Sequence, residues 1–228
     1  WAKIKGIPII GEVNGTLSDV SLIYPWLKPV LAIIYWVSIT CFRLSTSLIT
    51  VTDGLADWLR NIVRDVPVYT VPNGANATYF HPEVERTDCF DDPYIVFVGA
   101  MSPWQGIDTL IDASNNPTWP HQVKLIFVGD GFERQKVVEA AKSNSKIIYL
   151  GKRPHHQIPG IIAGSVAGVS TQNNKRGKTA KYGFSALKVY ETMACGVPVI
   201  VTDFPGQGDV IRKAQAGIVV SPEDDRAI

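Results

Sequence analysis

The 228-residue chain has few cysteines and almost no net charge, and each shortage excludes classes of protein. Its three cysteines, Cys41, Cys89 and Cys195, lie far apart and form no Cys-x-x-Cys pair, so we expect neither a zinc knuckle nor a disulfide framework. Lys and Arg number 22 against 21 Asp and Glu, and a net charge of +1 provides no global basic field for nucleic acid. The cysteine usage favours a reducing compartment, so we predict a cytoplasmic protein.

Several motifs of nucleotide-binding and hydrolytic enzymes are also missing. The sequence has no Gly-x-x-x-x-Gly-Lys-Ser/Thr loop and no Gly-x-Ser-x-Gly elbow, which argues against a P-loop NTPase and an α/β-hydrolase. Gly129-Asp130-Gly131 lacks the third glycine of a dinucleotide fingerprint, so it supports an NAD site only weakly. His155 and His156 are neighbours that would point to different faces of a helix, so we expect no metal pair there.

The composition is that of a folded protein, with 46% hydrophobic and 19% charged residues. Short apolar runs alternate with helical patterns, and most runs lack the period-two alternation of half-exposed strands. This order predicts an α/β fold with doubly wound, Rossmann-like parallel sheets. The expected strands are 7–13, 48–52, 66–71, 94–99, 124–129, 146–150, 167–170, 197–202 and 217–220, and the expected helices are 26–44, 54–63, 106–114, 133–143, 156–164, 185–195 and 207–214.

A domain boundary is predicted between the two halves of this pattern. Pro72-Asn73-Gly74 is a turn signal, and segment 81–92 after it is acidic and without periodicity. Because the chain begins at Trp1 without an initiator Met and stops at Ile228 after an acidic turn, we expect a fragment truncated at both ends. We place part of a first domain at 1–75, a linker at 76–92 and a nearly complete second domain at 93–228.

The helix expected at 26–44 is unusually apolar, because its segment Pro29–Phe42 carries no charge. Such a helix is buried in a core or contacts lipid. Fourteen uncharged residues are too few to span a bilayer, and a span would separate two strands that should share a sheet. A core helix is the ordinary interpretation. The alternative is a helix on the inner face of a membrane, with Trp26, Tyr35 and Trp36 exposed to lipid.

The segment from Tyr182 to Ile200 has the most informative pattern. A glycine-containing loop leads into a helix that we expect to begin near Ser185, where free N–H groups and the positive end of the dipole suit a phosphate. Lys188 in the first turn opposes the dipole, and a bound anion would account for it. Glu191 is placed to accept hydrogen bonds from sugar hydroxyls. The spacing fits equally well a surface helix with Lys188 and Glu191 as an ion pair.

The same segment resembles the signature of the retaining glycosyltransferases of family 4 (group 1), which have the GT-B fold. Other motifs of that family follow in the right order. They are Val71-Pro72-Asn73-Gly74 with Phe80-His81-Pro82, Val96-Phe97-Val98-Gly99 with Gly106-Ile107-Asp108, Phe127-Val128-Gly129-Asp130-Gly131 with Arg134, Tyr149-Leu150-Gly151, and Asp203-Phe204-Pro205-Gly206. The resemblance covers nearly the whole chain and is strongest from 93 to 222.

The resemblance implies a hexosyltransferase-like enzyme that moves a sugar from a nucleotide-sugar to a polysaccharide, lipid-linked or other glycoconjugate acceptor, with retention. No metal or other cofactor is implied, because cationic side chains and a helix terminus neutralise the leaving diphosphate. The second domain would bind the donor, with Glu191 on the ribose and loop Gly99–Gly106 closing over the phosphates. The implied donor-binding residues are Phe184, Ser185, Ala186, Leu187, Lys188, Glu191, Gly99, Gln105 and Arg153, and the acceptor-side residues are Asn14 and Gly15.

Four positions depart from the family's pattern. The usual Arg after the strand-end glycine is Ala100, and the usual Lys before the next glycine is Gln105. The first Glu of the paired-Glu motif is Gly183, and a His common in the first domain is Asn14. We favour a variant in which Lys188 supplies the missing cation from the helix. Nearby cations that would either help or form a solvated loop are Lys175, Arg176, Lys178 and Lys181.

Two other functions of the same fold are alternatives. One is a catalytically weak protein that binds nucleotide-sugars or acts as a scaffold. The other is an epimerase that acts on a nucleotide-sugar and uses carboxylates for proton transfer, for which the sequence offers no convincing acid/base pair.

Overall fold

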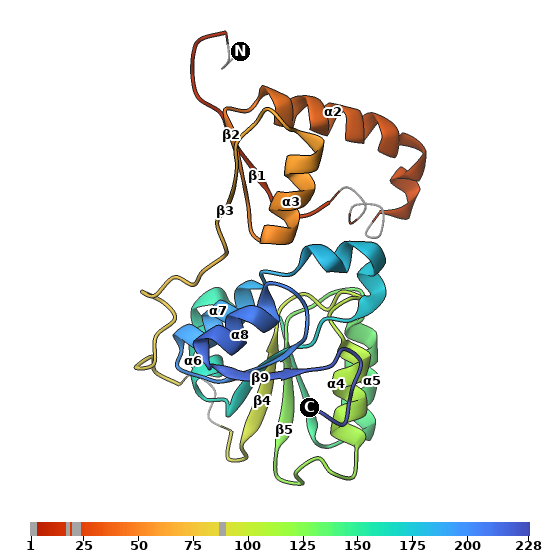
Figure 1. Cartoon of the computed structure of the whole chain (residues 1–228). Helices are drawn as coiled ribbons and strands as arrows, with labels where there is room; N and C mark the ends of the chain where they lie inside the picture. The colour runs from red at the N-terminus through yellow and green to blue at the C-terminus, as the bar shows by residue number, and fades with distance from the viewer. Residues whose placement is uncertain (1–3, 17–18, 20–23, 87–89) are drawn as a thin grey trace. The chain divides into compact units, whose positions relative to one another are not determined.

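The computed structural model describes residues 4–16, 19, 24–86 and 90–228 (Figure 1). Its contacts divide the chain into two compact units. The first unit comprises Trp1–Asn73 with Arg176–Ser185, and the second comprises Gly74–Lys175 with Ala186–Ile228. Segment 176–185, which the sequence analysis assigns to the second domain, therefore groups with the first unit. The functional roles of the two domains stay predictions.

The first unit has a three-stranded parallel sheet in the order β1-β2-β3. Its strands are β1 (Ile10–Val13), β2 (Ser47–Thr50) and β3 (Val68–Thr70). Helix α3 (Asp53–Ile62) begins after Thr52, whose hydroxyl accepts a hydrogen bond from the N–H of Leu55 at 3.3 Å. Its apolar face packs on the sheet because Leu55, Ala56 and Leu59 lie on one side of the helix.

The apolar helix of the first unit is formed as predicted, but it is not buried. The 3-10 helix η1 (Pro25–Val30) continues into α2 (Leu31–Leu44), and neither has a buried residue. Trp26, Ile33 and Trp36 expose 74%, 64% and 68% of their surface. Within the described residues, the helix is therefore not part of a core, as the core-helix interpretation would require. A helix that is apolar nearly all round presents only one face to a three-stranded sheet, so its other faces have nothing in the described chain to pack against.

The stretch Pro25–Leu44 has 20 residues and a mean hydropathy of 1.5, which by length and composition suffices to cross a membrane. The sheet nevertheless constrains it. Strands β1 and β2, which precede and follow this stretch, pair directly with each other in parallel. A parallel pair needs a crossover that returns the chain to the same end of the sheet, so this helix is the crossover and does not separate the strands.

The second unit is built on a six-stranded parallel sheet in the order β6-β5-β4-β7-β8-β9. This is the strand order of a doubly wound Rossmann sheet, as the sequence predicts. The strands are β4 (Tyr94–Val98), β5 (Lys124–Val128), β6 (Ile147–Gly151), β7 (Ala167–Ser170), β8 (Val199–Thr202) and β9 (Gly217–Val220).

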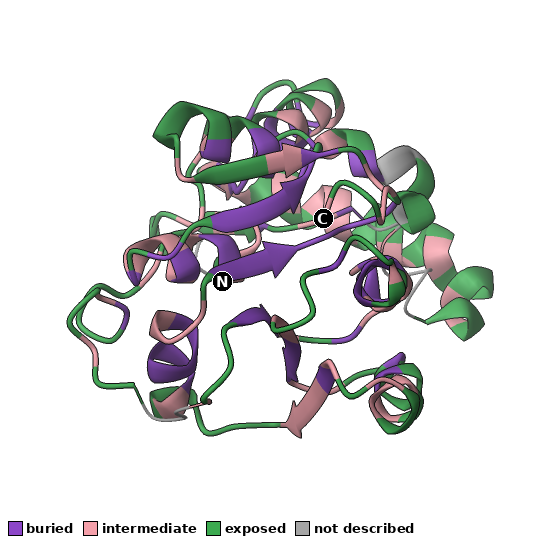
Figure 2. Ribbon diagram, turned by 90° about the horizontal axis from the view of Figure 1, so that it is seen from below, coloured by how far each residue is buried: buried purple, intermediate pink, exposed green. Residues whose placement is uncertain are grey.

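Helices cover both faces of this sheet. Helices α4 (Ile107–Asn115) and α5 (Arg134–Ser143) share one hydrophobic core with the strands. The other face is covered by α6 (Ile158–Ala163), which follows the 3-10 helix η2 (His155–Gln157), and by α7 (Leu187–Ala194) and α8 (Gln207–Ala214). Figure 2 shows central strands that are buried and helices that alternate between buried and exposed residues.

Strands β4 and β5 are apolar on both sides because each side faces a helical layer. The rings of Phe97 and Phe127 meet in one core with centroids 5.7 Å apart, and both side chains are fully buried. Full burial of such a ring contributes about 1.5–3 kcal/mol.

One element escapes the sequence analysis, the 3-10 helix η3 (Asn174–Tyr182), which is interrupted at Gly177. Short 3-10 turns have neither the 3.6-residue periodicity nor the length that reveals an α-helix.

Candidate functional site

The strand order reverses between β4 and β7, so their carboxyl ends open at the point where such sheets bind ligands. Two loops leave the sheet there. Loop Gly99–Gly106 connects β4 to α4, and segment Thr171–Lys175 follows β7. All of these residues belong to the second unit.

Hydrogen bonds tie the two loops together. The Thr171 hydroxyl donates to the Gln105 carbonyl at 3.2 Å, and the Asn173 amide donates to the Pro103 carbonyl at 2.9 Å. Gly106 has a φ of +67°, and a Cβ there would lie 1.8 Å from the Thr171 carbonyl oxygen, so only glycine fits. These contacts join the two loops into one wall of the site, and closure of loop Gly99–Gly106 over a ligand stays a prediction.

Lys188 extends from α7 to this wall. Its Nζ donates to Oε1 of Gln105 at 2.7 Å and stands 3.9 Å above the centroid of the Phe97 ring. It also lies against the end of β4, since a Cβ built on Gly99 would be 3.4 Å from it. The structure thus brings together Gly99, Gln105 and Lys188, three of the predicted donor-binding residues.

The charge of Lys188 has no acidic partner at ion-pair distance among the residues that the structure describes. Its side chain is partly accessible, yet desolvation by the surrounding protein lowers the pKa of the ammonium to about 7, and the charge of Glu191 opposes this only in part. The ammonium therefore rests on a neutral amide and an aromatic face, which attract a cation without neutralising it.

Helix α7 begins at Leu187, two residues after the expected start, because Ala186 has extended backbone angles and caps the helix without a side-chain hydrogen bond. The N–H of Val189 donates to the Ala186 carbonyl at 3.0 Å, whereas those of Leu187 and Lys188 keep room for another acceptor. Ser185 belongs to the first unit, where its hydroxyl accepts a hydrogen bond from the N–H of Asn73 at 3.1 Å. Phe184, Asn14 and Gly15 also belong to the first unit.

Glu191 lies one turn beyond Lys188 on α7 and is partly exposed. Its carboxylate accepts no hydrogen bond from the part of the chain that the structure describes. Burial raises the pKa of this carboxyl, while electrostatic interactions with the nearby His155 and Lys188 lower it in part. His155 closely follows the exposed Arg153 in the chain, so the segment after β6 approaches Glu191.

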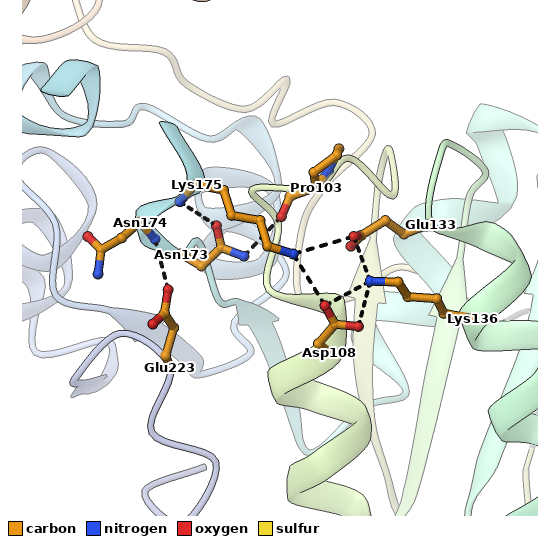
Figure 3. A network of polar contacts seen from close by, with 8 residues as sticks. All are labelled: Pro103, Asp108, Glu133, Lys136, Asn173, Asn174, Lys175 and Glu223. Carbon is orange, nitrogen blue, oxygen red and sulfur yellow. Dashed lines mark hydrogen bonds and ion pairs between the residues drawn. The ribbon is translucent and has the colours of Figure 1, made fainter. Parts of the chain in front are cut away.

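Lys175, one of the cations for which the sequence left open either help to Lys188 or a place in a solvated loop, has its charge engaged elsewhere (Figure 3). Its Nζ lies 3.3 Å from Asp108 and 3.6 Å from Glu133. Lys136 bridges the same two carboxylates at 2.7 and 2.9 Å. Burial alone would raise the pKa of the Asp108 carboxyl, but hydrogen bonds from both lysines outweigh it and hold that pKa below 3.8.

This group, which we term the two-lysine cluster (Asp108, Glu133, Lys136 and Lys175), is balanced in formal charge. The Glu133 side chain is only 8% exposed, and its Oε2 is buried without a hydrogen bond. The cluster joins the loop after β5, the start of α4 and the segment after β7. It therefore holds the loops that surround Lys188 in place.

The other candidate cations do not join Lys188 either. Lys181 belongs to the first unit, where its ammonium lies 5.1 Å from the Tyr182 ring. The side chains of Arg176 and Lys178 lie outside the described residues. Among residues 4–16, 19, 24–86 and 90–228, no three His, Cys, Asp or Glu side chains gather as a metal site requires.

Sequence reasoning missed Phe97, Thr171 and Asn173 as parts of the site. The run Thr171-Gln172-Asn173-Asn174 directly follows a buried strand, and a polar run at the end of a parallel strand was a usable signal.

Comparison with known proteins agrees with this architecture. Sucrose-phosphate synthase from Thermosynechococcus elongatus superimposes on 99% of this chain and 58% of its own, with a TM-score of 0.71 at 18% identity. Anabaena HepE in complex with UDP-glucose superimposes on 99% of this chain and 61% of its own, with a TM-score of 0.70 at 17% identity. The predicted α/β fold of GT-B type, with parallel sheets, is therefore confirmed.

At the sequence level, a probable sucrose-phosphate synthase of Thermosipho melanesiensis is 23% identical over 165 residues. The alignment covers 69% of this chain but 37% of that protein, so the chain spans well under half the length of this curated relative. The profile of the family "Glycosyl transferases group 1" matches residues 92–228, more than half of the chain. This protein belongs to the group 1 glycosyltransferases.

Proposed function

We propose that the protein transfers a hexose from a nucleotide-sugar to a glycan or lipid-linked acceptor with retention of configuration, as in family 4 of the retaining glycosyltransferases. The observation that carries the proposal is the unpaired ammonium of Lys188 at the carboxyl ends of β4 and β7. A cation left without a carboxylate in a partly desolvated place costs free energy, and an anionic ligand offsets that cost. The complex of HepE with UDP-glucose supports such a donor by similarity of fold.

In this proposal the diphosphate lies between Lys188 and the first turn of α7. The ammonium donates to a phosphate oxygen, and free N–H groups of the first turn donate to the same group. When the bond to the sugar breaks, negative charge grows on the leaving phosphate, and these fixed donors stabilise it. We therefore propose that transfer needs no metal or other cofactor.

Glu191 holds the ribose of the donor in this scheme. A half-buried carboxylate without hydrogen bonds is costly, and two vicinal hydroxyls would supply them. Its position on the same helix as Lys188 lets one rigid element hold both the ribose and the diphosphate.

A donor-binding protein without turnover is the second candidate, and the glycine at position 183 favours it, because the family's pattern has a carboxylate there. A direct experiment separates the two. UDP-, GDP- and ADP-sugars are screened by thermal shift, and the release of free nucleoside diphosphate is then followed with the best ligand. Binding with release supports the transferase, binding without release supports the second candidate, and no binding contradicts both.

We also propose that the helical stretch Pro25–Leu44 lies on the cytoplasmic face of a membrane and brings the protein to a lipid-linked acceptor. Its exposed Trp26, Ile33 and Trp36 suit the lipid interface, and its only charged residues, Lys28 and Arg43, suit anionic head groups. We expect the Trp26→Ser/Trp36→Ser variant to lose flotation with vesicles rich in phosphatidylglycerol. Ile218→Ser, which removes an equally exposed apolar side chain from β9, should float like the wild type; equal flotation of all three proteins would contradict the proposal.

A further inference from the structure

The contact between Gln105 and Lys188 joins two elements that are 83 residues apart in sequence. Gln105 lies in the loop after β4, and Lys188 belongs to the first turn of α7. The amide oxygen and the ammonium are 2.7 Å apart, so the ends of both side chains meet near the carboxyl end of β4.

We infer that Gln105 is the positioning residue for Lys188, and that positions 105 and 188 form one cation site in which either can supply the ammonium while the other stays neutral. The inference rests on the proposed binding of a nucleoside diphosphate. It adds a second residue to that site. It also predicts that a lysine placed at position 105 can replace the lysine at position 188.

The backbone of Gln105 is well placed to aim a partner. Its N–H donates to the Ser102 carbonyl at 2.9 Å, and its carbonyl accepts from the Thr171 hydroxyl at 3.2 Å. Gly106, directly after it, fits only as glycine. The amide therefore projects from a fixed point, whereas the flexible stem of a lysine is oriented by the groups that it meets at its end.

The hydrogen bond leaves most of the lysine's capacity unused. An ammonium has three N–H donors, of which Gln105 takes one. The Phe97 ring lies 3.9 Å below the ammonium, which leaves the solvent side for an anion. An amide holds the ammonium without cancelling its charge, whereas a carboxylate at the same place would neutralise it and repel a phosphate.

The test moves the lysine from position 188 to position 105 and measures ligand affinity by calorimetry. The ligands are whichever of UDP, GDP or ADP binds the wild type best and the matching nucleoside. Lys188→Gln should weaken the diphosphate by at least about tenfold, as expected for loss of a charge-assisted contact, and leave the nucleoside unchanged. Adding Gln105→Lys to that variant should recover most of the lost affinity. Gln105→Glu alone should weaken the diphosphate about as much as Lys188→Gln.

The matched control is Gln122→Lys in the Lys188→Gln background. Gln122 is exposed just before β5, at the opposite end of the strands, so it adds the same charge away from the site and should rescue nothing. Thermal unfolding confirms that each variant is folded, and Lys188→Met replaces Lys188→Gln if the latter is not.

The outcomes separate the two claims. A wild type that binds the diphosphates and a double variant that stays as weak as Lys188→Gln would overturn the shared site alone. Rescue by Gln122→Lys to the same extent would overturn it too, because general electrostatic attraction would then explain the data. A wild type that binds none of the ligands would overturn the proposed function and this inference with it.

Discussion

Lys188 and the two-lysine cluster lie in the same unit, at the carboxyl end of the same sheet, but their lysines have different partners. In the cluster, Lys136 and Lys175 meet Asp108 and Glu133, and every lysine has a carboxylate within 4 Å. Lys188 meets an amide and an aromatic ring instead. The comparison teaches that a balanced cluster can hold loops in place, whereas a cation left unbalanced beside them is available to a ligand.

The largest effect should come from removing the unbalanced charge. We expect Lys188→Met to weaken binding of a nucleoside diphosphate by about 10- to 150-fold, because one charge-assisted hydrogen bond contributes about 1.5–3 kcal/mol. Lys175→Met, which removes a charge from the cluster, should change the affinity little. Calorimetry on both variants checks this, and equal losses would remove the distinction between the two lysines.

For the free energy of unfolding, we expect the larger loss from a lysine of the cluster and not from Lys188. Lys136→Met leaves the buried Glu133 carboxylate with a weaker partner, so we expect the free energy of unfolding to fall by about 1–3 kcal/mol. Lys188→Met removes a desolvated charge without a carboxylate partner, so it should not destabilise the protein. Urea unfolding measures both, and a larger loss for Lys188→Met would show that this lysine serves the fold.

The pH dependence of stability sharpens the comparison further. The folded pKa of Lys188 is about 7, below the ordinary value of 10.5, so between these values the unfolded chain binds more protons than the folded chain. This residue therefore destabilises the protein below pH 7, and its penalty disappears as the pH rises toward 10.5. The stability advantage of Lys188→Met should be larger at pH 6 than at pH 9, and a constant difference would contradict the lowered pKa.

The smallest effect is expected at Glu191. Glu191→Gln keeps the shape of the side chain and one acceptor oxygen, so we expect affinity to fall only about three- to tenfold, as for a weakened hydrogen bond. Because its proposed partner is the ribose, the nucleoside and the nucleoside diphosphate should lose affinity equally. A loss confined to the diphosphate would place Glu191 away from the ribose.

Much of the fold was predictable because buried parallel strands leave a strong signal. The runs 167–170 and 217–220 and the helix 207–214 were predicted with the bounds that the structure has. Composition also predicted that 31–44 is helical, but burial depends on what packs against a helix, and its own residues do not encode that. Helix α7 starts two residues after the predicted start near Ser185, because no side chain there caps it with a hydrogen bond.

The site was predictable only as a set of residue types. Local arguments about a cation in a first helical turn identified Lys188, which the fold places beside Gly99 and Gln105. They did not predict that Lys175, only 13 positions earlier, is bound by two carboxylates from distant segments. Whether a lysine is balanced depends on contacts across many residues, which spacing along one helix does not contain.

The most direct test of the central claim is an NMR titration of the Lys188 side-chain amine, with and without UDP. The account predicts a pKa of about 7 for this amine in the free protein. The pKa should rise when UDP binds and should not change when uridine binds, because only the diphosphate stabilises the ammonium. An identical titration with UDP bound to the protein would contradict the account.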